Sequence, residues 1–434
     1  MHWATREERL NLGQARRKQV ARSQHEEFNS KARKGTALKL IEHSMKGRIP
    51  ALVKLKYERM LCSPFGYFRG AAPVMAADLS VAPDTGLVAQ LCGDAHVCNL
   101  GAYAAPDGRR MFDINDFDET IQGPFEWDLK RMAASIVLSG REAGHKDGSS
   151  RKAAELCVAA YARLMHQFAE MRLLEVSRWQ VHRLSQVEPV AAALRKAEIS
   201  SPLHTVEQLT IVAASRSEEV RRFRENKPIL SRITGAKAIS ILASLGPYRK
   251  GLEPQRQHLL SLFKPVDVAF KVVGVGSVGL RDYCIYLEGN GPEDALFLQI
   301  KEETDSCYAP YLAAAHPPSH NGQRVAEGQK AMQMQTDPLL GWTQIGGRDY
   351  LVRQLNDHKG SIDLANLTGE NLVTYAEVCG ELLARGHARS SDPVVLSGYL
   401  GKGEVFSEAI ADFGMAYANQ TEKDWTALKR SGKI

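Results

Sequence analysis

The spacing of hydrophobic residues divides the first half of the chain into helices and two short strands. Leu and Val recur at helical spacing among charged residues over 5–60, which predicts helices there. LVAQLC (87–92) and RMFDIN (110–115) are apolar runs of strand length, and the turn residues APDGR precede the second run. Residues 127–140 predict a buried helix, and residues 150–260, rich in Ala, Leu, Glu and Arg, predict a mostly helical region.

The pattern changes near residue 265. FKVVGVGSVGLRDYCIYLEG (270–289) and ALFLQIKEE (295–303) predict strands, and NGQRVAEGQKAMQMQ (321–335) predicts a helix. LLGWTQIGGRDYLVRQL (339–355) predicts two further strands around a Gly-Gly turn, and helical patterns return from 367. A β-rich unit is therefore expected between two largely helical regions.

The positive charge of the chain is concentrated at its start. The formal net charge is +6, and residues 1–40 hold ten Lys or Arg against four Glu, which accounts for the whole excess. A basic arm could meet nucleic acid or an acidic partner. No aromatic ladder accompanies the charge, which argues against a nucleic-acid module. We therefore expect a solvated helical extension.

Cysteines and apolar runs indicate the compartment. The seven cysteines are scattered, odd in number and without a CxxC pair, which is typical of reduced thiols and not of a disulfide framework or a zinc site. The first residues are too charged for a signal peptide, and no apolar run approaches the ~18 residues of a membrane span. These features predict a cytoplasmic protein with no membrane contact.

Three glycines with the spacing G-x-G-x-x-G occur at Gly274, Gly276 and Gly279, in VGVGSVGLR. In a dinucleotide-binding fold this motif opens a helix, whereas here a strand follows. A glycine loop between two strands covers the nucleotide phosphates in protein kinases, because glycine lets the backbone approach phosphate closely. We predict that this loop, including Ser277, binds a nucleotide; a tight hairpin without a ligand is the alternative.

The next strand and helix add two residues that suit nucleotide binding. Lys301 ends the apolar strand LFLQIK, where an inward ammonium requires an anionic partner. Glu327 lies on the following helix, and a strand lysine paired with a helix glutamate holds the phosphates in kinases. Glu302 and Glu303 are weaker candidates, since they follow the lysine directly. Glycine loop, lysine strand, glutamate helix and two strands together form the architecture of a kinase small lobe.

The acidic stretch at 91–120 supplies candidates for the other half of a kinase site. Asp94 and Asn99 fit the pattern D-x-x-x-x-N, and Asp116 follows the next strand. The letters GDAH resemble the GD-x-H form of aminoglycoside and choline phosphotransferases. That resemblance implies that Asp94 accepts the proton of a hydroxyl group while Asn99 and Asp116 hold Mg²⁺, with Asp118 as a further candidate ligand.

Five further residues are supporting candidates. GPFEWDLKRMA resembles the phosphotransferase segment in which an Asp at a helix start braces the catalytic loop, so Asp128 is the candidate; a helix N-terminal acid is the structural alternative. His96 suits a structural role in the loop, or contact with phosphate. Arg69, in the turn FRG, suits substrate or phosphate binding, or a buried structural role. His387 and Arg389 are expected to line the cleft.

The two halves of the predicted site stand in the reverse of the kinase order. Circular permutation would explain this, because domain termini are often close and exposed. The literal DFG at 412–414 lies in a helical pattern, and we interpret it as coincidence. We predict an α+β, protein kinase-like fold of two lobes, circularly permuted. Its expected parts are a basic helical arm (1–62), a large helical lobe with the catalytic and metal loops (63–264), a β-rich nucleotide-binding lobe (265–356) and C-terminal helices that complete the large lobe (357–434).

The full length also resembles a bacterial family catalogued as domain of unknown function 2252. The resemblance rests on SPFGYFRGAAPVMAADL, GDAHVCNLGAY, FDINDFDETIQGPFEWDLKRMAAS, VVGVGSVGLR, LFLQIKE, RVAEGQKAMQ, DYLVRQL and LARGHARS. The family implies no established activity, so the functional prediction depends on the motifs. The chain departs from the kinase pattern in its order, in Asp118 where the DFG glycine would stand, and in the absence of an HRD triplet.

The sequence therefore predicts a kinase-like phosphotransferase that uses ATP and Mg²⁺ on a hydroxyl acceptor, with a small molecule favoured over a protein. Transfer of AMP suits the same scaffold. Two alternatives stay open. DFDET fits the DxDxT signature of phosphohydrolases, with Asp116 as nucleophile and Asp118 as general acid or base, although Asp113 and Asn115 interrupt the apolar strand that it needs. The other is a pseudokinase that binds nucleotide without catalysis.

Overall fold

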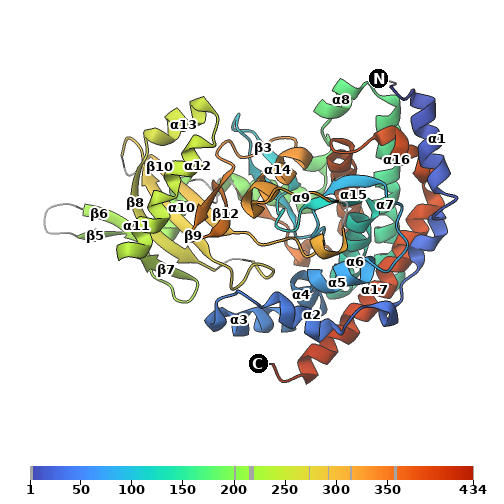
Figure 1. Ribbon diagram of the computed structural model, residues 1–434, viewed down its shortest axis with the longest axis horizontal. Helices are drawn as coiled ribbons and strands as arrows, with labels where there is room; N and C mark the ends of the chain where they lie inside the picture. Colours follow the sequence, from blue (N-terminus) through green and yellow to red (C-terminus); the bar gives the residue numbers. More distant parts are fainter. Residues whose placement is uncertain are drawn as a thin grey trace.

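The computed structural model describes residues 3–199, 202–214, 219–272, 274–291, 293–312, 315–355 and 359–433. Within these ranges the chain is an α+β protein in which a sheet-rich part lies beside a larger helical part (Figure 1). Neighbouring strands in its sheets pair antiparallel. Among the helices in these ranges, none has the length and apolar character that a bilayer crossing requires.

Six strands form the main sheet, in the order β11-β12-β10-β9-β8-β7. Their bounds are β7 Leu230–Ile233, β8 Lys264–Lys271, β9 Asp282–Glu288, β10 Ala295–Glu302, β11 Gly341–Ile345 and β12 Arg348–Gln354. Alternate residues of β9 enter two different apolar clusters, Ile285 and Leu287 on one face and Cys284 and Tyr286 on the other, because successive side chains of a strand point to opposite faces. Both faces of the sheet are therefore covered.

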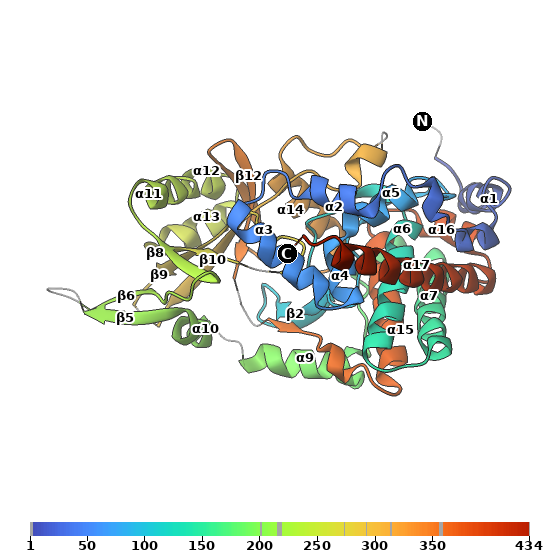
Figure 2. The ribbon, with the colours of Figure 1, turned by 90° about the horizontal axis from the view of Figure 1, so that it is seen from below.

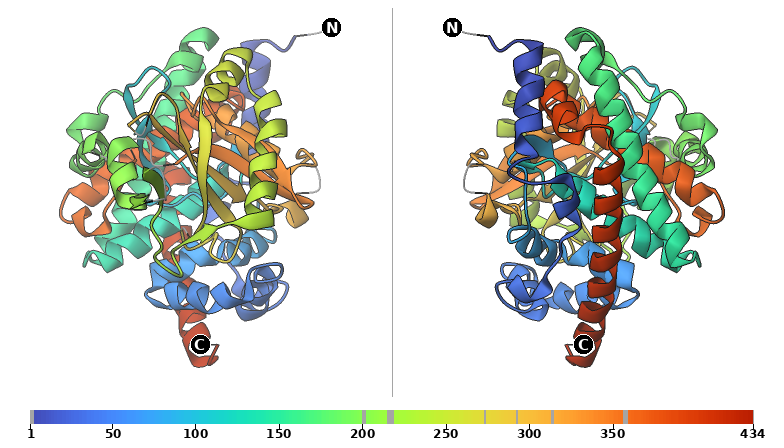
Figure 3. Two further views of the ribbon diagram at one scale, coloured as in Figure 1. Left: turned by 90° about the vertical axis from the view of Figure 1, so that its left-hand side faces the viewer. Right: turned by 90° about the vertical axis from the view of Figure 1, so that its right-hand side faces the viewer.

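Segments that precede β8 in sequence provide this cover. One face is covered by the helices α11 Gly235–Ala243, α12 Leu245–Lys250 and α13 Pro254–Ser261. Ile241 of α11 and Tyr248 of α12 pack in the same apolar cluster as residues of the sheet. On the other face lie α10 Pro202–Leu209 and the hairpin of β5 Thr210–Ala214 and β6 Glu219–Phe223 (Figure 3, left). The sheet-rich part thus takes in residues from about 202, ahead of the expected start at 265, because β7 pairs with β8.

Segments from both ends of the chain build the helical part. Its long helices are α6 Glu126–Glu142, α7 Asp147–Glu170, α15 Asn371–Ala388 and α17 Glu404–Arg430, with the shorter α8 Leu173–Arg178, α9 Glu188–Ile199 and α16 Pro393–Leu400. α15 packs on α7, and α17 packs on α6 and α7 (Figure 3, right). Asp412 lies inside α17 and pairs with Arg151, so the DFG letters are helical, as their pattern predicted.

Two small sheets carry the loops of the acidic stretch. β1 Val88–Leu91 pairs with β4 Ile121–Pro124, and β2 Leu100–Ala104 pairs with β3 Arg110–Ile114 and with β13 Gly360–Ser361. The strand β13, which comes shortly after β12 in the sequence, therefore pairs with the strand that follows the Asp94 loop. This pairing places the end of the main sheet beside the acidic loops.

The basic N-terminal arm packs on the protein and is not a solvated extension. It contains α1 Arg6–Arg16, α2 Ala37–Ser44 and α3 Pro50–Leu61, followed by α4 Pro64–Gly70 and α5 Ala72–Leu79 (Figure 2). Arg17 and Arg22 donate to the last carbonyl groups of α16, where the helix dipole favours cations. Arg33 forms a buried ion pair with Asp78. Arg17, Arg22 and Arg33 of the arm thus bind other parts of the chain.

Candidate functional site

The chain turns sharply after β1, and this turn carries Asp94. Gly93 has a φ of +83°, and a Cβ there would lie 2.2 Å from a backbone oxygen of the β3–β4 connection, so the position requires glycine. Asp128, in the first turn of α6, accepts hydrogen bonds from the backbone N–H groups of Cys92 (2.8 Å) and Gly93 (3.0 Å). This is the bracing contact expected from the sequence. Nε2 of His387 lies 3.3 Å from Oδ2 of Asp128.

Arg131, a residue that the sequence reasoning missed, holds Asp94. Its Nε donates to Oδ1 of Asp94 over 2.6 Å, and its guanidinium lies over the ring of Phe68 at 4.2 Å. The Arg131 side chain is fully buried, whereas 17% of the Asp94 side chain is exposed. Burial raises the pKa of Asp94, and the charge of Arg131 opposes that shift. The carboxylate is therefore fixed in orientation and still open to the cavity on one side.

His96 and Asn99 shape the same loop. Nδ1 of His96 accepts from the N–H of Cys98 over 3.2 Å, which leaves Nε2 to carry the proton of the neutral ring. Burial and the charge of Arg69 hold the pKa of His96 well below its usual range. Nδ2 of Asn99 donates to the carbonyl oxygen of Asp94 (2.6 Å), and no described residue donates a hydrogen bond to its side-chain oxygen. That oxygen is available to a cation.

The loop after β3 carries Asp116 and Asp118, and both face Lys301 of β10. Nζ of Lys301 donates to both carboxylate oxygens of Asp118 and lies 3.7 Å from Oδ1 of Asp116. Oδ1 of Asp116 is buried without a hydrogen-bond partner among the described residues. The contact joins the main sheet to the acidic loop.

These charges influence one another strongly. Burial and the neighbouring Asp116 raise the pKa of Asp118 to about 7. Burial also opposes ionisation of Asp116, yet Lys301 and Arg353 hold the pKa of Asp116 well below its usual range. For Lys301, burial opposes protonation, and the two carboxylates raise its pKa above the ordinary value. Lys301 therefore stays protonated, and near neutral pH the two carboxylates bind up to one proton between them.

The glycine segment between β8 and β9 is held in place by the end of the N-terminal arm. Four donors of residues 48–59 reach its backbone carbonyl groups: Arg48 to Val278 (2.6 Å), the N–H of Ile49 to Gly279 (2.8 Å), Lys56 to Gly276 (2.6 Å) and Arg59 to Gly274. Gly274 and Gly279 have φ of +64° and +92°, a backbone conformation that favours glycine. The Lys56 side chain is almost completely buried in this contact.

Residues from the two acidic loops and the glycine segment line one cavity of about 610 Å³, named here the site cavity. Its lining includes Arg48, Arg69, Asp94, His96, Asn99, Asp116, Asp118, Gly274, Gly276, Ser277 and Glu303. Gly279 lies at the far end of the same segment, against Arg48. The structure thus brings together the predicted catalytic, metal and phosphate residues, although the two groups are far apart in the sequence.

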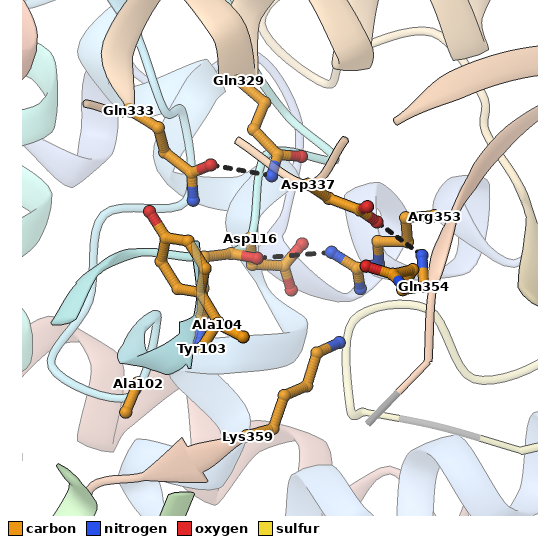
Figure 4. A pocket seen from close by; sticks show the side chains of 11 residues that line it. Ala102, Tyr103, Ala104, Asp116, Gln329, Gln333, Asp337, Arg353, Gln354 and Lys359 are labelled. Atoms are coloured by element: carbon orange, nitrogen blue, oxygen red, sulfur yellow. Dashed lines mark hydrogen bonds between the residues drawn. The ribbon is translucent and has the colours of Figure 1, made fainter. Parts of the chain in front are cut away.

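A second cavity of about 690 Å³ adjoins the site cavity, and Asp116 borders both. Most of its lining residues have polar side chains: Tyr103, Asn115, Gln329, Gln333, Asp337, Arg353, Gln354 and Lys359, together with Ala102 and Ala104 (Figure 4). Figure 4 shows Lys359 and Asp116 pointing into the same space, with Arg353 and Gln354 entering from β12. Burial and the charge of Arg353 lower the pKa of Lys359 to about 7.

The expected pairing of Lys301 with Glu327 is not formed. Glu327 is exposed on α14 Asn321–Met332, accepts a hydrogen bond from Gln323 (2.8 Å) and lines a separate cavity. Asp118 takes its place as the partner of Lys301. α14 instead directs Arg324 inward, where its guanidinium donates to backbone carbonyl groups of the 118–120 loop. The helix therefore supports the acidic loop through main-chain contacts.

His387 and Arg389 line neither of the two cavities. His387 is fully buried between Asp128 and the hydroxyl of Tyr161 (3.0 Å). Arg389 donates to the carbonyl oxygen of Ala331 (3.1 Å) and to a second backbone carbonyl on α8. Both residues support structure, and His387 does so directly behind the Asp94 loop.

The oxygen atoms present suit Mg²⁺ bound together with phosphate. In the described part of the chain, no three His, Cys, Asp or Glu side chains are arranged to hold a metal ion by themselves. Mg²⁺ commonly binds through one or two carboxylates, waters and substrate phosphates. Asp116, with its unpartnered Oδ1, and Asn99, with its open side-chain oxygen, fit that requirement. Asp118 is occupied by Lys301.

A family model described as "Uncharacterized protein conserved in bacteria (DUF2252)" matches residues 48–431. The matched range begins at Arg48 and contains all the residues that line the site cavity. No curated protein and no solved structure is significantly similar to the chain.

Proposed function

We propose that this chain, which belongs to the bacterial family DUF2252, is a kinase-like phosphotransferase that uses ATP and Mg²⁺. The observation that carries the proposal is the contact of Lys301 with Asp118 and Asp116, formed beside a cavity that Asp94 and the glycine segment also line. A site for nucleotide phosphates gives one reason for all of these parts to converge.

The proposed fold is that of a two-lobed protein kinase in permuted order. The sheet-rich part supports this, because the glycine segment joins β8 to β9, Lys301 lies on β10, and α14, β11 and β12 follow. The helical part supplies the Asp94 and Asp116 loops. His387 of α15 contacts Asp128, which holds the Asp94 loop. A helix that follows the main sheet in the sequence therefore supports a loop that precedes this sheet in the sequence. Permutation explains that arrangement.

In this proposal the triphosphate lies under the glycine segment, and Lys301 binds it from the sheet side. The adjoining cavity, with Gln354 and Asn115 among its polar groups, would take the base and ribose, because Asp116 borders both spaces. Asn99 and Asp116 would hold Mg²⁺, which would neutralise charge on the phosphates. Lys301 keeps its proton throughout, since two carboxylates raise its pKa against the effect of burial.

Asp94 is the proposed general base. It takes the proton of the acceptor hydroxyl as the oxygen–phosphorus bond forms and the bond to the leaving oxygen of ADP breaks. Arg131 fixes the orientation of the carboxylate and favours its ionised form against the effect of burial. A positioned base of this kind typically contributes ~10²–10⁴-fold in rate. AMP transfer would break the bond at the α-phosphorus instead, so labels on the α- and γ-phosphates distinguish the two reactions.

The DxDxT alternative has no comparable support. The hydroxyl of Thr120 donates to the carbonyl oxygen of Leu91 (2.5 Å), and Asp118 is bound by Lys301. The signature matches as letters, but its Thr and its second Asp are already engaged elsewhere.

Binding of ATP to the full chain, with and without Mg²⁺, tests the proposal. Lys301→Met and Asp116→Asn should each weaken ATP binding at least about tenfold, because each removes a charged group that faces the phosphates or their cation. The matched controls are Lys54→Met, on the exposed face of α3, and Asp412→Asn in α17, which should leave binding unchanged. Equal binding by both site variants and the wild-type protein would contradict the proposal.

A further inference from the structure

One histidine and two arginines line the wall of the site cavity around the Asp94 loop: His96, Arg48 and Arg69. Two carboxylates of the same lining, Asp94 and Asp118, are already bound by Arg131 and Lys301. The three side chains are therefore additional hydrogen-bond donors, and two of them are positively charged. Two guanidinium groups that form no ion pair with a described carboxylate, on the wall of one cavity, suit an anionic ligand.

Arg69 has no partner among the described residues. It lies in the last turn of α4, and its Nε is buried without a hydrogen bond. Leaving a buried N–H of a charged group without an acceptor is costly, so its presence calls for an explanation. Arg69 lines the site cavity together with Asp94 and His96 of the Asp94 loop.

Arg48 and His96 extend the same surface. Arg48 donates from Nε to the carbonyl oxygen of Ser44 (2.9 Å) and from Nη1 to that of Val278 (2.6 Å), contacts that leave its charge without a paired carboxylate. His96 is neutral and carries its proton on Nε2, which lies 3.8 Å from Oδ2 of Asp94. An anion at Arg69 would thus lie beside the proposed general base.

We propose that Arg69, supported by Arg48 and His96, binds an anionic group of the acceptor, so that the acceptor carries both a hydroxyl and a carboxylate or phosphate group. This inference rests on the proposed phosphotransfer function. Lys301 already serves the nucleotide phosphates from the sheet side, whereas Arg69 borders the residue that receives the hydroxyl proton. A guanidinium binds carboxylate and phosphate with two parallel hydrogen bonds. Holding the acceptor at its anion would orient its hydroxyl toward Asp94.

The test uses the full chain saturated with a non-hydrolysable ATP analogue and Mg²⁺, so that the triphosphate positions are filled. Calorimetry then measures binding of glycerate, glycerol 3-phosphate and, as the neutral control, glycerol. We expect binding of at least one anionic compound, and the two arms distinguish carboxylate from phosphate. Arg69→Gln should weaken it about 10- to 100-fold while analogue affinity stays the same. Arg69→Lys should fall between, and the exposed Arg110→Gln should have no effect.

Three results would overturn the inference. They are absence of anion binding to the wild-type protein, equal anion binding by Arg69→Gln, and anion binding that occurs only when the analogue is left out, which would assign Arg69 to the triphosphate. Failure of the analogue to bind the wild-type protein would instead count against the proposed function, and the anion arms without nucleotide would still decide the role of Arg69. If Arg69→Gln melts early, the charge-conserving Arg69→Lys decides.

Discussion

From the contact of Lys301 with Asp116 and Asp118 we predict how much free energy of unfolding this contact contributes by holding the two halves of the site together. The perturbation is Lys301→Met, which keeps the length of the side chain and removes its charge. It leaves Asp116 and Asp118 facing each other without the ammonium group that lies between them. Asp118→Asn removes one of these carboxylates, and the double variant combines both changes. Lys54→Met, at an exposed position, is the matched control.

The magnitude follows from burial and distance. The side chain of Lys301 is 4% exposed, and those of Asp118 and Asp116 are 23% and 40% exposed. At about 4 Å and an effective dielectric of ~20, a lysine–carboxylate pair is worth ~4 kcal/mol, much of which offsets the cost of burying the ions. Removing one partner of a buried pair costs ~3–5 kcal/mol. Because both carboxylates retain solvent contact, we expect the lower value, about 3 kcal/mol, at pH 8.

Asp118→Asn should behave differently. The pKa of Asp118, about 7, lies above its ordinary 3.8, so ionising Asp118 opposes folding, and the stability that its protonated form contributes is lost as pH rises through about 7. The amide should therefore stabilise the protein less at pH 5 than at pH 8, where the gain should reach up to ~1 kcal/mol and Lys301 keeps Asp116. In the double variant it should restore about 2 kcal/mol of the loss, a coupling typical of residues in contact.

Urea unfolding followed by circular dichroism at pH 5 and pH 8 measures these differences, with an unchanged m-value as the condition for comparing variants. The loss in Lys301→Met should be smaller at pH 5, where the carboxylates can take up a proton. Losses that add within ~0.5 kcal/mol, or a loss that is equal at both pH values, would refute the shared pair.

Three further predictions concern the loops around the site. Burial keeps the folded-state pKa of His96 below 6.5, so the stability that its neutral ring contributes is present above pH 6.5 and is lost as pH falls. His96→Asn should therefore reduce the acid-side slope of the free energy of unfolding against pH, measured by urea unfolding, by up to ~1.4 kcal/mol per pH unit. Gly279→Ala should lower thermal stability by ~1–2 kcal/mol, because φ is +92° and the new Cβ would lie 3.0 Å from Arg48; an unchanged melting temperature would contradict this. Lys56→Met should speed hydrogen exchange at 274–280 and weaken ATP binding about threefold or more, since it leaves the carbonyl oxygen of Gly276 without its donor, whereas Lys56→Arg should lose less.

The parts of the site that lie close together in sequence could be predicted. Asp94 and Asn99 are five residues apart, and their hydrogen bond closes a local loop. Asp128 follows a strand and opens a helix, so its contact with that loop depends on the pairing of β1 with β4. The strand position of Lys301 follows from an apolar run that ends in an ammonium, which calls for an anionic partner.

The choice of partner across the chain could not be predicted. Glu327 and Arg324 are three residues apart on α14 and lie on adjacent helix positions, so periodicity does not decide which one faces the site. Packing of α14 against the 118–120 loop selects Arg324, and Asp118 then meets Lys301. Arg131 lies in a helix that is buried almost all round. Its charge alone predicts an exposed position, and only the ion pair with Asp94 accounts for its burial.

The short stretch from α3 to α4 contacts both groups of residues that line the site cavity. Lys56 binds the glycine segment at Gly276, and nine residues later Phe65 packs edge-on against His96 of the Asp94 loop, with ring centroids 5.9 Å apart. One continuous stretch thus touches both halves of the cavity, and Arg69 at its end faces the space between them. Movement of the glycine segment away from the Asp94 loop would break the buried Lys56 contact, so under the proposed function the phosphate site would be organised before a nucleotide binds. The family match begins at Arg48, so the matched range includes all four donors that reach the glycine segment.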